Sequence, residues 1–512
     1  MPDQAPEVQA REFADAFRSF LNWIHASDSE GHHNEVAALV NGFLGPDGAA
    51  HSVVSHNLPV FEHVNLQTAI DAWAARSGRA VDVHGVLLPQ HYRLALQQVV
   101  SAESVPNGLR LIAPTLIALP NGPETTLGCL KLALLLVTDA RGRYVIMVQS
   151  ANEQHPSLEI EVAGLPADEA QAVLAELDQL RSELNVYRGH MLNAAVNPMG
   201  GGIILTFAAP PGLHRDDVVL PDAVLTRAER HALGVAAHRD ALLAAGQHLK
   251  RGLLLYGPPG TGKTHTTRYL LGQMTGYTRL VLTGRALFGV GAVTEMAREL
   301  QPSVVVLEDV DLVAEDRSMR PGASPVLFDL LDAMDGAAPD ADLLFLLTTN
   351  RADLLEPALA ARPGRVDVAV EIELPDGPAR ERLLALYGRD VSLALTPEDI
   401  AAAVERTEGT TASFLRELIR RSFLEALQDP PAEAAAGAPS RPAARSAPTV
   451  TGAHLARALD DLLDSAQGVT RTLLGVGVDP KTLPAGALAA GPRPAAASAY
   501  RRVIPRSGWT AG

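Results

Sequence analysis

Short apolar runs alternate with stretches of helical periodicity along the second half of the chain. The runs read LLLYG, RLVLTG, SVVVLED, LLFLLTTN and DVAVEIELP, and helical stretches separate the first four. This alternation is typical of a parallel sheet covered by helices on both faces. It predicts an α/β domain over residues 216–375 and helical segments over residues 376–470, interrupted by a low-complexity linker at 429–448.

The first 165 residues have a mixed pattern. Phenylalanines recur at helical spacing between residues 13 and 21, which predicts an amphipathic opening helix. Strand-like runs at 130–138 and 144–150 flank the turn-forming sequence DARGR and predict a hairpin, and a third run follows at 158–164. We therefore expect an α+β domain over residues 1–165.

Residues 166–215 are expected to connect the two domains through a helix, a second hairpin and a proline-rich linker. The helix is predicted over residues 166–188. Its apolar positions have the 4-3-4 spacing of a coiled-coil seam, at Val173, Leu177, Leu180 and Leu184. The spacing leaves two interpretations open, a short coiled coil between subunits or a helix that packs on its own domain.

The composition argues against several classes of function and of site. The chain has 512 residues, of which 47% are hydrophobic, enough to bury a sizeable core. Its net charge of −16 argues against nucleic-acid binding through bulk electrostatics. The single cysteine, Cys129, allows no disulfide within the chain and no cysteine-based zinc site, and we expect a small buried side chain there.

The sequence predicts no attachment to a membrane. The N-terminus lacks the basic and apolar regions of a signal peptide. The longest apolar runs are far shorter than the roughly 20 residues that span a bilayer. We therefore expect a cytoplasmic protein with no membrane span. Residues 471–512 predict a flexible tail, which from Lys481 onward is basic and has no acidic residue.

The strongest chemical signal is a glycine-rich loop between a predicted strand and a predicted helix. It has the pattern GxxxxGK[ST] and comprises Gly257, Pro258, Pro259, Gly260, Thr261, Gly262, Lys263 and Thr264. Glycines let backbone N–H groups converge on a phosphate without Cβ clashes, and the helix N-terminus adds positive potential. In this pattern Lys263 reaches the β- and γ-phosphates and the Thr264 hydroxyl ligates Mg²⁺, so the loop predicts binding of ATP with Mg²⁺.

A second signal is an apolar strand that ends in carboxylates. The run VVVLEDVD places Glu308 and Asp309 at the end of a predicted strand. A P-loop nucleotidase needs carboxylates opposite its phosphates, because one holds Mg²⁺ and the next orients the attacking water. The alternative is a buried strand whose acidic end has no catalytic role.

Five segments follow one another in a fixed order between residues 257 and 367. They read GPPGTGKT, PSVVVLEDVDLVAEDR, LFDLLDAMDG, LLTTNRADLLEPAL and ARPGRVD. In this order they resemble the ATPase domain of the AAA+ family, in its classical AAA clade. The resemblance covers residues 216–470 and implies a P-loop α/β domain, a helical lid, hydrolysis of ATP to ADP and phosphate, and an oligomeric ring, expected to be a homohexamer.

The resemblance also implies roles for further residues. Glu308 and Asp309 would be the catalytic carboxylates, and Asn350 would position the attacking water together with them. Arg362 and Arg365 would reach the nucleotide of the neighbouring subunit as arginine fingers.

One segment occupies the place of the family's pore loop, which grips polypeptide in the central channel. It consists of Leu287, Phe288 and Gly289. The alternative for Phe288 is a core side chain in a helical turn.

The sequence departs from the clade at three places. The clade normally has Asp-Glu where this chain has Glu308 and Asp309, an order that also occurs in the AAA translocase of the mitochondrial inner membrane that moves a folded iron–sulfur protein. The resemblance then implies that Glu308 takes the Mg²⁺ side and Asp309 the water. One extra residue lies between Pro357 and Arg362, and the lid sequence EGTTASFLREL lacks the clade's Ser-Gly-Ala-Asp.

These observations favour an ATP-driven protein remodeller or unfoldase that works as a ring and uses its N-terminal domain to select a protein substrate or partner. One alternative is a soluble translocase or assembly factor for folded cargo, suggested by the Glu-Asp order and the β-rich segment before the ATPase domain. Another is a nucleotide-gated scaffold that hydrolyses little ATP. A protease is disfavoured because the sequence has no HExxH motif, and a DNA remodeller because of the acidic net charge.

Arginine fingers act on a neighbouring subunit, so Arg362→Ala and Arg365→Ala should each leave ATP binding intact and lower turnover in a steady-state ATPase assay. Fingers contribute roughly 10³–10⁵-fold in GTPases, and we expect a smaller loss in a ring. Mixing Arg365→Ala subunits with Lys263→Ala subunits should restore part of the activity, because an intact P-loop then meets an intact finger. A fully active monomer in sedimentation would contradict the ring.

Overall fold

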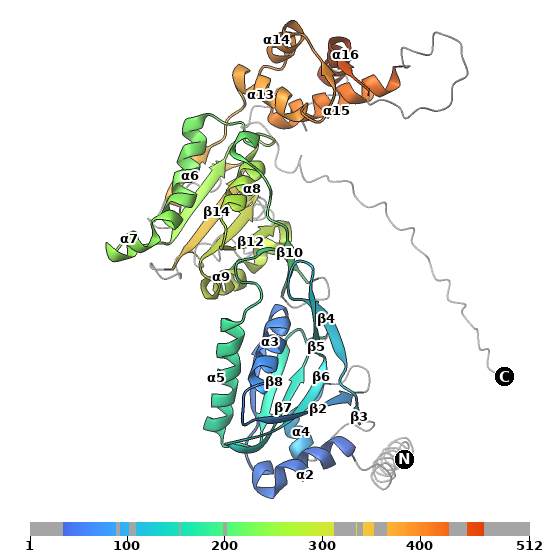
Figure 1. Cartoon of the computed structure of the whole chain (residues 1–512), viewed down its shortest axis with the longest axis vertical. Coiled ribbons are helices and arrows are strands. Elements are labelled where there is room, and N and C mark those ends of the chain that lie inside the picture. Colours follow the sequence, from blue (N-terminus) through green and yellow to red (C-terminus); the bar gives the residue numbers. More distant parts are fainter. Residues whose placement is uncertain are drawn as a thin grey trace, which may run out of the picture.

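The computed structural model describes residues 34–88, 93–101, 109–152, 155–197, 202–311, 334, 341–352, 366–429 and 448–464. Within these ranges an N-terminal domain, a P-loop domain and a helical lid follow one another along the long axis of the molecule (Figure 1). None of the helices in the described part is both long and apolar enough to cross a bilayer. The helix predicted at 13–21 and the tail at 471–512 lie outside the described residues, as does most of the linker predicted at 429–448.

The N-terminal domain is an antiparallel sheet with helices on both faces. Its strands have the order β1-β8-β7-β6-β2-β3. Their bounds are β1 Val54–Leu58, β2 Ala80–Leu87, β3 Arg110–Ile112, β6 Leu132–Asp139, β7 Gly142–Gln149 and β8 Leu158–Ala163. Helices α3 (His63–Ala74) and α5 (Ala167–Glu183) pack on one face, and α2 (Glu35–Ala49) and α4 (Leu96–Ser101) on the other. A separate hairpin, β4 (Leu116–Pro120) and β5 (Thr126–Leu130), extends toward the P-loop domain (Figure 1).

Several predictions for this domain are confirmed. Strands β6 and β7 form the hairpin expected at 130–138 and 144–150, and β8 is the third strand. The predicted connecting helix is α5, which ends at Glu183 rather than at residue 188. Its seam residues Val173, Leu177 and Leu180 lie in the same core cluster as Trp73 of α3, whereas the fourth, Leu184, follows the helix and is 41% exposed. Three of the four predicted seam residues are therefore buried within their own domain, which supports the second of the two interpretations.

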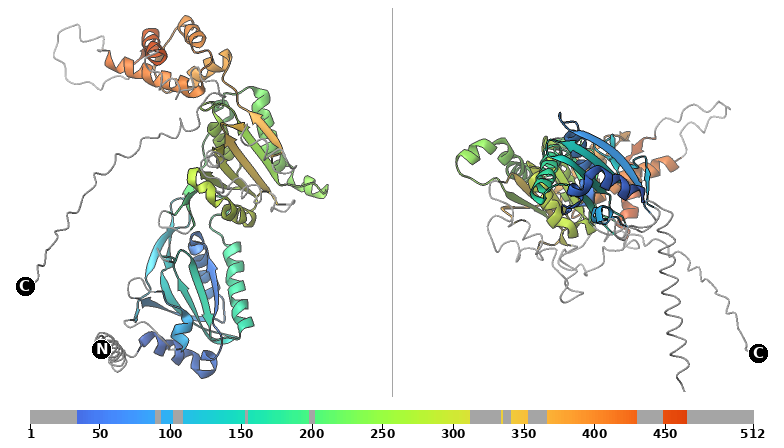
Figure 2. Two further views of the ribbon diagram at one scale, coloured as in Figure 1. Left: turned by 180° about the vertical axis from the view of Figure 1, so that it is seen from behind. Right: turned by 90° about the horizontal axis from the view of Figure 1, so that it is seen from below.

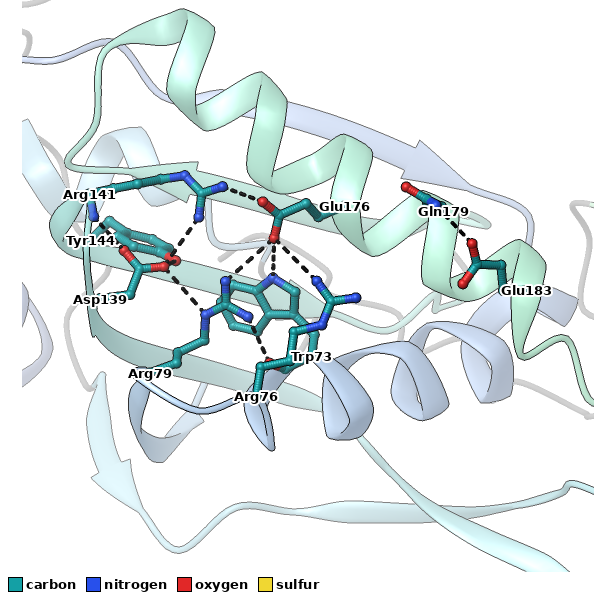
Figure 3. Close-up of polar contacts among 9 residues, drawn as sticks. All are labelled: Trp73, Arg76, Arg79, Asp139, Arg141, Tyr144, Glu176, Gln179 and Glu183. Atoms are coloured by element: carbon teal, nitrogen blue, oxygen red, sulfur yellow. Dashed lines mark hydrogen bonds and ion pairs between the residues drawn. The ribbon is translucent and has the colours of Figure 1, made fainter.

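Paired, partly buried charges link α5 to α3 and to the turn between β6 and β7 (Figure 3). The carboxylate of Glu176 on α5 accepts hydrogen bonds from the indole N–H of Trp73 at 3.1 Å and from the Arg79 guanidinium at 3.4 Å. Arg141 bonds to both Glu176 and Asp139. The Arg79 guanidinium also lies 3.7 Å from the centre of the Trp73 ring. Because these charges pair with one another, their partial burial is tolerated, and they add polar contacts to the apolar packing between the two helices.

The P-loop domain is built on a seven-stranded sheet with the order β10-β9-β12-β13-β14-β11-β15 (Figure 1). The bounds are β9 Met191–Val196, β10 Ile203–Ala208, β11 Arg251–Tyr256, β12 Thr278–Thr283, β13 Ser303–Glu308, β14 Leu343–Thr349 and β15 Val368–Glu371. Every pair is parallel except β9 with β10. Helices α6 (Asp222–Ala237) and α8 (Lys263–Gln273) pack on one face, and η3 (Gly284–Gly289) and α9 (Val290–Glu299) on the other. Shorter helical elements are η2 (Arg215–Asp217) and α7 (Arg239–Ala244) in this part of the chain, and η1 (Val60–Glu62), which directly precedes α3 in the N-terminal domain.

The hairpin that the sequence assigned to the connecting segment belongs to this sheet. Strands β9 and β10 pair as expected, but β9 also pairs in parallel with β12. The apolar residues of β9 therefore cover the same core as the P-loop strands, and Leu192 is fully buried there.

The described part of the lid consists of four helices beyond the sheet, seen at the opposite end of the molecule from the N-terminal domain (Figure 2). They are α13 (Gly377–Tyr387), α14 (Pro397–Arg406), α15 (Ala412–Gln428) and α16 (Gly452–Leu463), and a short parallel pair joins β16 (Leu393–Ala394) to β17 (Val450–Thr451). Their apolar faces meet in one cluster around Phe414, Leu415 and Leu459. The predicted helical lid is confirmed.

The N-terminal domain and the P-loop domain share a core. Cys129 of β5 is fully buried in the same cluster as Leu287 of η3. Beside this cluster, Arg181 of α5 pairs with Glu62 at 2.8 Å and with Glu299 at the end of α9 at 3.5 Å. Burial raises the pKa of Glu62, while the guanidinium of Arg181 opposes that rise. Apolar contacts therefore hold the two domains together, and an ion pair between the buried Arg181 and the partly exposed Glu299 crosses the boundary.

Candidate functional site

The glycine-rich loop joins the carboxyl end of β11 to the N-terminus of α8. Gly257 has a φ of 145°, and a Cβ at this position would collide with the carbonyl group of Ile372, so only glycine fits. Helix α8 begins at Lys263, so the last two residues of the loop motif form the start of the helix. The first turn of a helix has N–H groups without intrahelical partners, which attract anions. The predicted strand–loop–helix setting is confirmed.

The ammonium group of Lys263 is held by the loop itself. Its Nζ donates to the carbonyl oxygens of Gly257 and Pro258, both at 2.8 Å. Burial lowers the pKa of Lys263 to about 8, and the charges of Asp309 and Asp311 oppose the shift. The Lys263 ammonium is thus buried between backbone carbonyl groups of the loop and lies within range of the carboxylates of Asp309 and Asp311.

Glu308 and Asp309 face different partners. The Glu308 carboxylate is hydrogen-bonded to the Thr264 hydroxyl, whereas Asp309 approaches Asn350, with 3.5 Å between Oδ1 and Nδ2. Burial raises the pKa of both carboxyl groups, and the charge of Asp309 adds to the shift of Glu308. Oxygen donors on Thr264 and Glu308 match the preference of Mg²⁺ for oxygen ligands, so the residues fit this ion.

The strand order brings these groups together. Strand β14 lies between β13 and β11, so the carboxyl ends that carry Glu308, Asn350 and the P-loop are neighbours in the sheet. Strands of a parallel sheet end at the same edge, and ligands bind there in open α/β sheets. The structure therefore assembles the P-loop, both carboxylates and Asn350 at one edge.

Hydrogen bonds between two loops add residues to which the sequence assigned no role. The Asp309 N–H donates to the Thr348 hydroxyl at 3.0 Å, and Asp311 accepts from Thr349 and Asn350. In the sequence, the two threonines at the end of the apolar run LLFLLTTN could have indicated this role, because they are polar residues at the end of an otherwise apolar strand.

The lid also contacts the P-loop. The backbone N–H of Ser413 donates to the Gly260 carbonyl at 3.1 Å, and the Ser413 hydroxyl lies 3.3 Å from the same oxygen. Thr411 is the N-cap of α15, and its hydroxyl accepts from the Phe414 N–H. The segment TTAS therefore places the N-terminus of a lid helix against the nucleotide loop, although its sequence departs from the clade.

The structure describes only some of the remaining residues to which the sequence assigned a role. Arg362 and Arg365 lie outside the described residues. Of the expected pore loop, Leu287 is buried in the shared core, whereas 58% of Phe288 is exposed. The interpretation of Phe288 as a core side chain is therefore wrong. Gly289 lies so close to Ile203 of β10 that a Cβ would collide with its side chain.

Comparison with known proteins agrees with this site. Residues 253–374 match the family described as "ATPase family associated with various cellular activities (AAA)". This range contains the P-loop, β13 with its carboxylates and β14 with Asn350. The chain therefore carries an AAA ATPase domain of the classical clade, a family whose usual cofactors are ATP and Mg²⁺.

Curated relatives align with the same part of the chain. The ATP-dependent zinc metalloprotease FtsH of Thermus thermophilus is 33% identical over 198 residues, which are 36% of this chain and 31% of that protein. The proteasome-activating nucleotidase of Methanopyrus kandleri is 33% identical over 193 residues, 35% of this chain and 44% of that protein. The 26S protease regulatory subunit 6A of Caenorhabditis elegans is 34% identical over 170 residues, 30% of this chain and 39% of that protein. The chain thus spans less than half the length of each of these relatives.

The different partners of Glu308 and Asp309 predict different phenotypes. Asp309→Asn should keep ATP binding, lower kcat by at least about 100-fold and accumulate the ATP-bound form, because a general base contributes 10²–10⁴-fold. Asparagine also tolerates the φ of 52° at this position. Glu308→Gln should instead weaken Mg²⁺-dependent nucleotide binding. Nucleotide titrations with and without Mg²⁺, combined with ATPase assays, measure both effects. If Glu308→Gln traps ATP while Asp309→Asn stays active, the two roles are exchanged.

Proposed function

We propose that this protein is an ATP-hydrolysing protein remodeller that works as an oligomeric ring, with a hexamer as the expected assembly. The observation that carries the proposal is the convergence of the P-loop, Glu308, Asp309 and Asn350 at one edge of the parallel sheet. The similarity of this domain to ATPases of proteolytic systems supports the same class. A cytoplasmic location and a protein substrate belong to the proposal.

Each group in the site has a proposed task in hydrolysis. Lys263 and the N-terminus of α8 bind the phosphates. Thr264 and Glu308 hold Mg²⁺, which neutralises charge on the β- and γ-phosphates when it is bound. Asp309 accepts a proton from the attacking water, and Asn350 holds that water in line. Arg362 and Arg365 act on the nucleotide of the neighbouring subunit, so assembly and turnover are coupled.

An ATPase assay on purified protein tests this function directly. Wild-type protein should release phosphate from ATP, and Lys263→Ala should lose ATP binding because the phosphates lose the cation of the loop. Lys131→Ala, which removes an exposed lysine of the N-terminal domain, is the matched control and should behave as wild type. Binding of ATP without turnover in the wild-type protein would instead support the nucleotide-gated scaffold.

The second candidate function is a translocase or assembly factor for folded cargo. The shared core and the pairing of Arg181 with both Glu62 and Glu299 favour it, because they tie the N-terminal domain to the P-loop domain. Domains joined in this way move together, as concerted opening of a ring around folded cargo requires. The exposed ring of Phe288 favours threading, which needs an aromatic grip at low entropic cost.

Phe288→Ala separates the two mechanisms. Because Phe288 is largely exposed, the change should leave melting temperature, assembly and basal ATPase activity near wild type. In a threading enzyme it should abolish ATP-dependent unfolding of a labelled protein substrate, and Phe288→Tyr should restore it. Leu427→Ala, which removes a side chain of similar exposure on the lid, is the control. An assembled Phe288→Ala variant that still remodels its substrate would exclude threading through this residue and favour the folded-cargo mechanism.

A further inference from the structure

Asn350 lies just beyond the strand that carries it. Strand β14 ends at Thr349, whose register partner is Tyr256 of β11. The sheet ladder therefore fixes β14 as far as Thr349 and leaves the backbone of the next residue to other partners. Because the Asn350 side chain must face Asp309 across the site, something else has to hold that backbone.

Asp311 supplies this contact. Its Oδ1 accepts a hydrogen bond from the Asn350 backbone N–H at 3.1 Å and another from the Thr349 hydroxyl at 2.9 Å. Asp311 is 6% exposed and Thr349 is fully buried. Hydrogen bonds to an ionised acceptor in a buried setting are stronger than neutral ones, so they restrain the end of β14 well.

The restraint is reciprocal between the two loops. Thr348 accepts from the loop after β13, through its hydroxyl from Asp309 and through its carbonyl from Val310, both at 3.0 Å. Asp311 accepts from the loop after β14. Four hydrogen bonds in opposite directions thus join the segment that carries Asp309 to the segment that carries Asn350.

We propose that Asp311 is a positioning residue for ATP hydrolysis, which holds the Asn350 side chain in register with Asp309 through the Thr349 hydroxyl and the Asn350 backbone N–H. This inference rests on the proposed ATPase function and deepens it. Asp311 acts through Asn350 and need not touch the nucleotide. Its carboxylate is the acceptor that lets two loops distant in sequence move as one unit.

Kinetics test this role first. Asp311→Ala should lower kcat about 10- to 100-fold, because a misplacement of about 1 Å has this effect, and should change KM for ATP by less than about threefold. Asp311→Asn retains an acceptor oxygen of the same length and should recover most of the loss. Wild-type kcat in Asp311→Ala, or a pure KM effect, would overturn the proposal.

A double-mutant cycle separates positioning from general stabilisation. If Asp311 acts through Asn350, the double variant Asp311→Ala/Asn350→Ala should be no slower than Asn350→Ala alone. Equal losses from Asp311→Ala in both backgrounds would show that the residue acts independently of Asn350. Should Asp311→Ala fail to fold, Thr349→Val removes one of the two donors in nearly the same shape and takes its place in the cycle.

Hydrogen exchange tests the inference without turnover. The Asn350 amide should exchange more slowly in the wild-type protein than in Asp311→Ala, while amides in the middle of β14 should be unchanged. Equal exchange at Asn350 in both proteins would overturn the inference even if the wild-type protein is an active ATPase. Wild-type protein without ATPase activity would overturn the proposed function, whereas slowed exchange at Asn350 would still show that Asp311 holds this backbone.

Discussion

The pairing of β14 with β13 on one side and β11 on the other is the constraint on which the site depends. All seven residues of β14 are buried. On one side Phe345 pairs with Val305 of β13, and on the other Leu346 pairs with Leu253 of β11. A central strand that is buried on both faces is held in register by ladders on both edges. This pairing places three carboxyl ends side by side and thereby puts the phosphate loop opposite its carboxylates and Asn350.

The reversed order of Glu308 and Asp309 has a physical basis in the backbone. Asp309 is the one non-glycine residue with a positive φ among the described residues, at 52°. Aspartate adopts this region more readily than most side chains do. Glu308, in contrast, is the last residue of β13, and its longer side chain reaches the Thr264 hydroxyl. The chain therefore has the longer carboxylate on the strand and the shorter one at the turn.

Helix α9 is one of the links between the site and the N-terminal domain. Helix α9 begins directly after Gly289 and ends at Glu299, which pairs with Arg181 of α5. Only a short connection separates the end of α9 from the start of β13 at Ser303. Helix α9 therefore lies between the segment around Phe288 and the contact with the N-terminal domain, and its C-terminal end is close in sequence to the strand that carries the carboxylates.

The sequence by itself determined the elements and the chemistry that local pattern encodes. Apolar runs predicted the strands, and the spacing of Gly257 to Thr264 predicted the phosphate loop, because both depend on residues close together in the chain. Tertiary structure alone decided that β9 extends the sheet, that Ser413 meets Gly260 and that Phe288 is exposed. These outcomes depend on which distant surfaces meet, and hydrophobic periodicity shows that a side chain is apolar without showing what covers it.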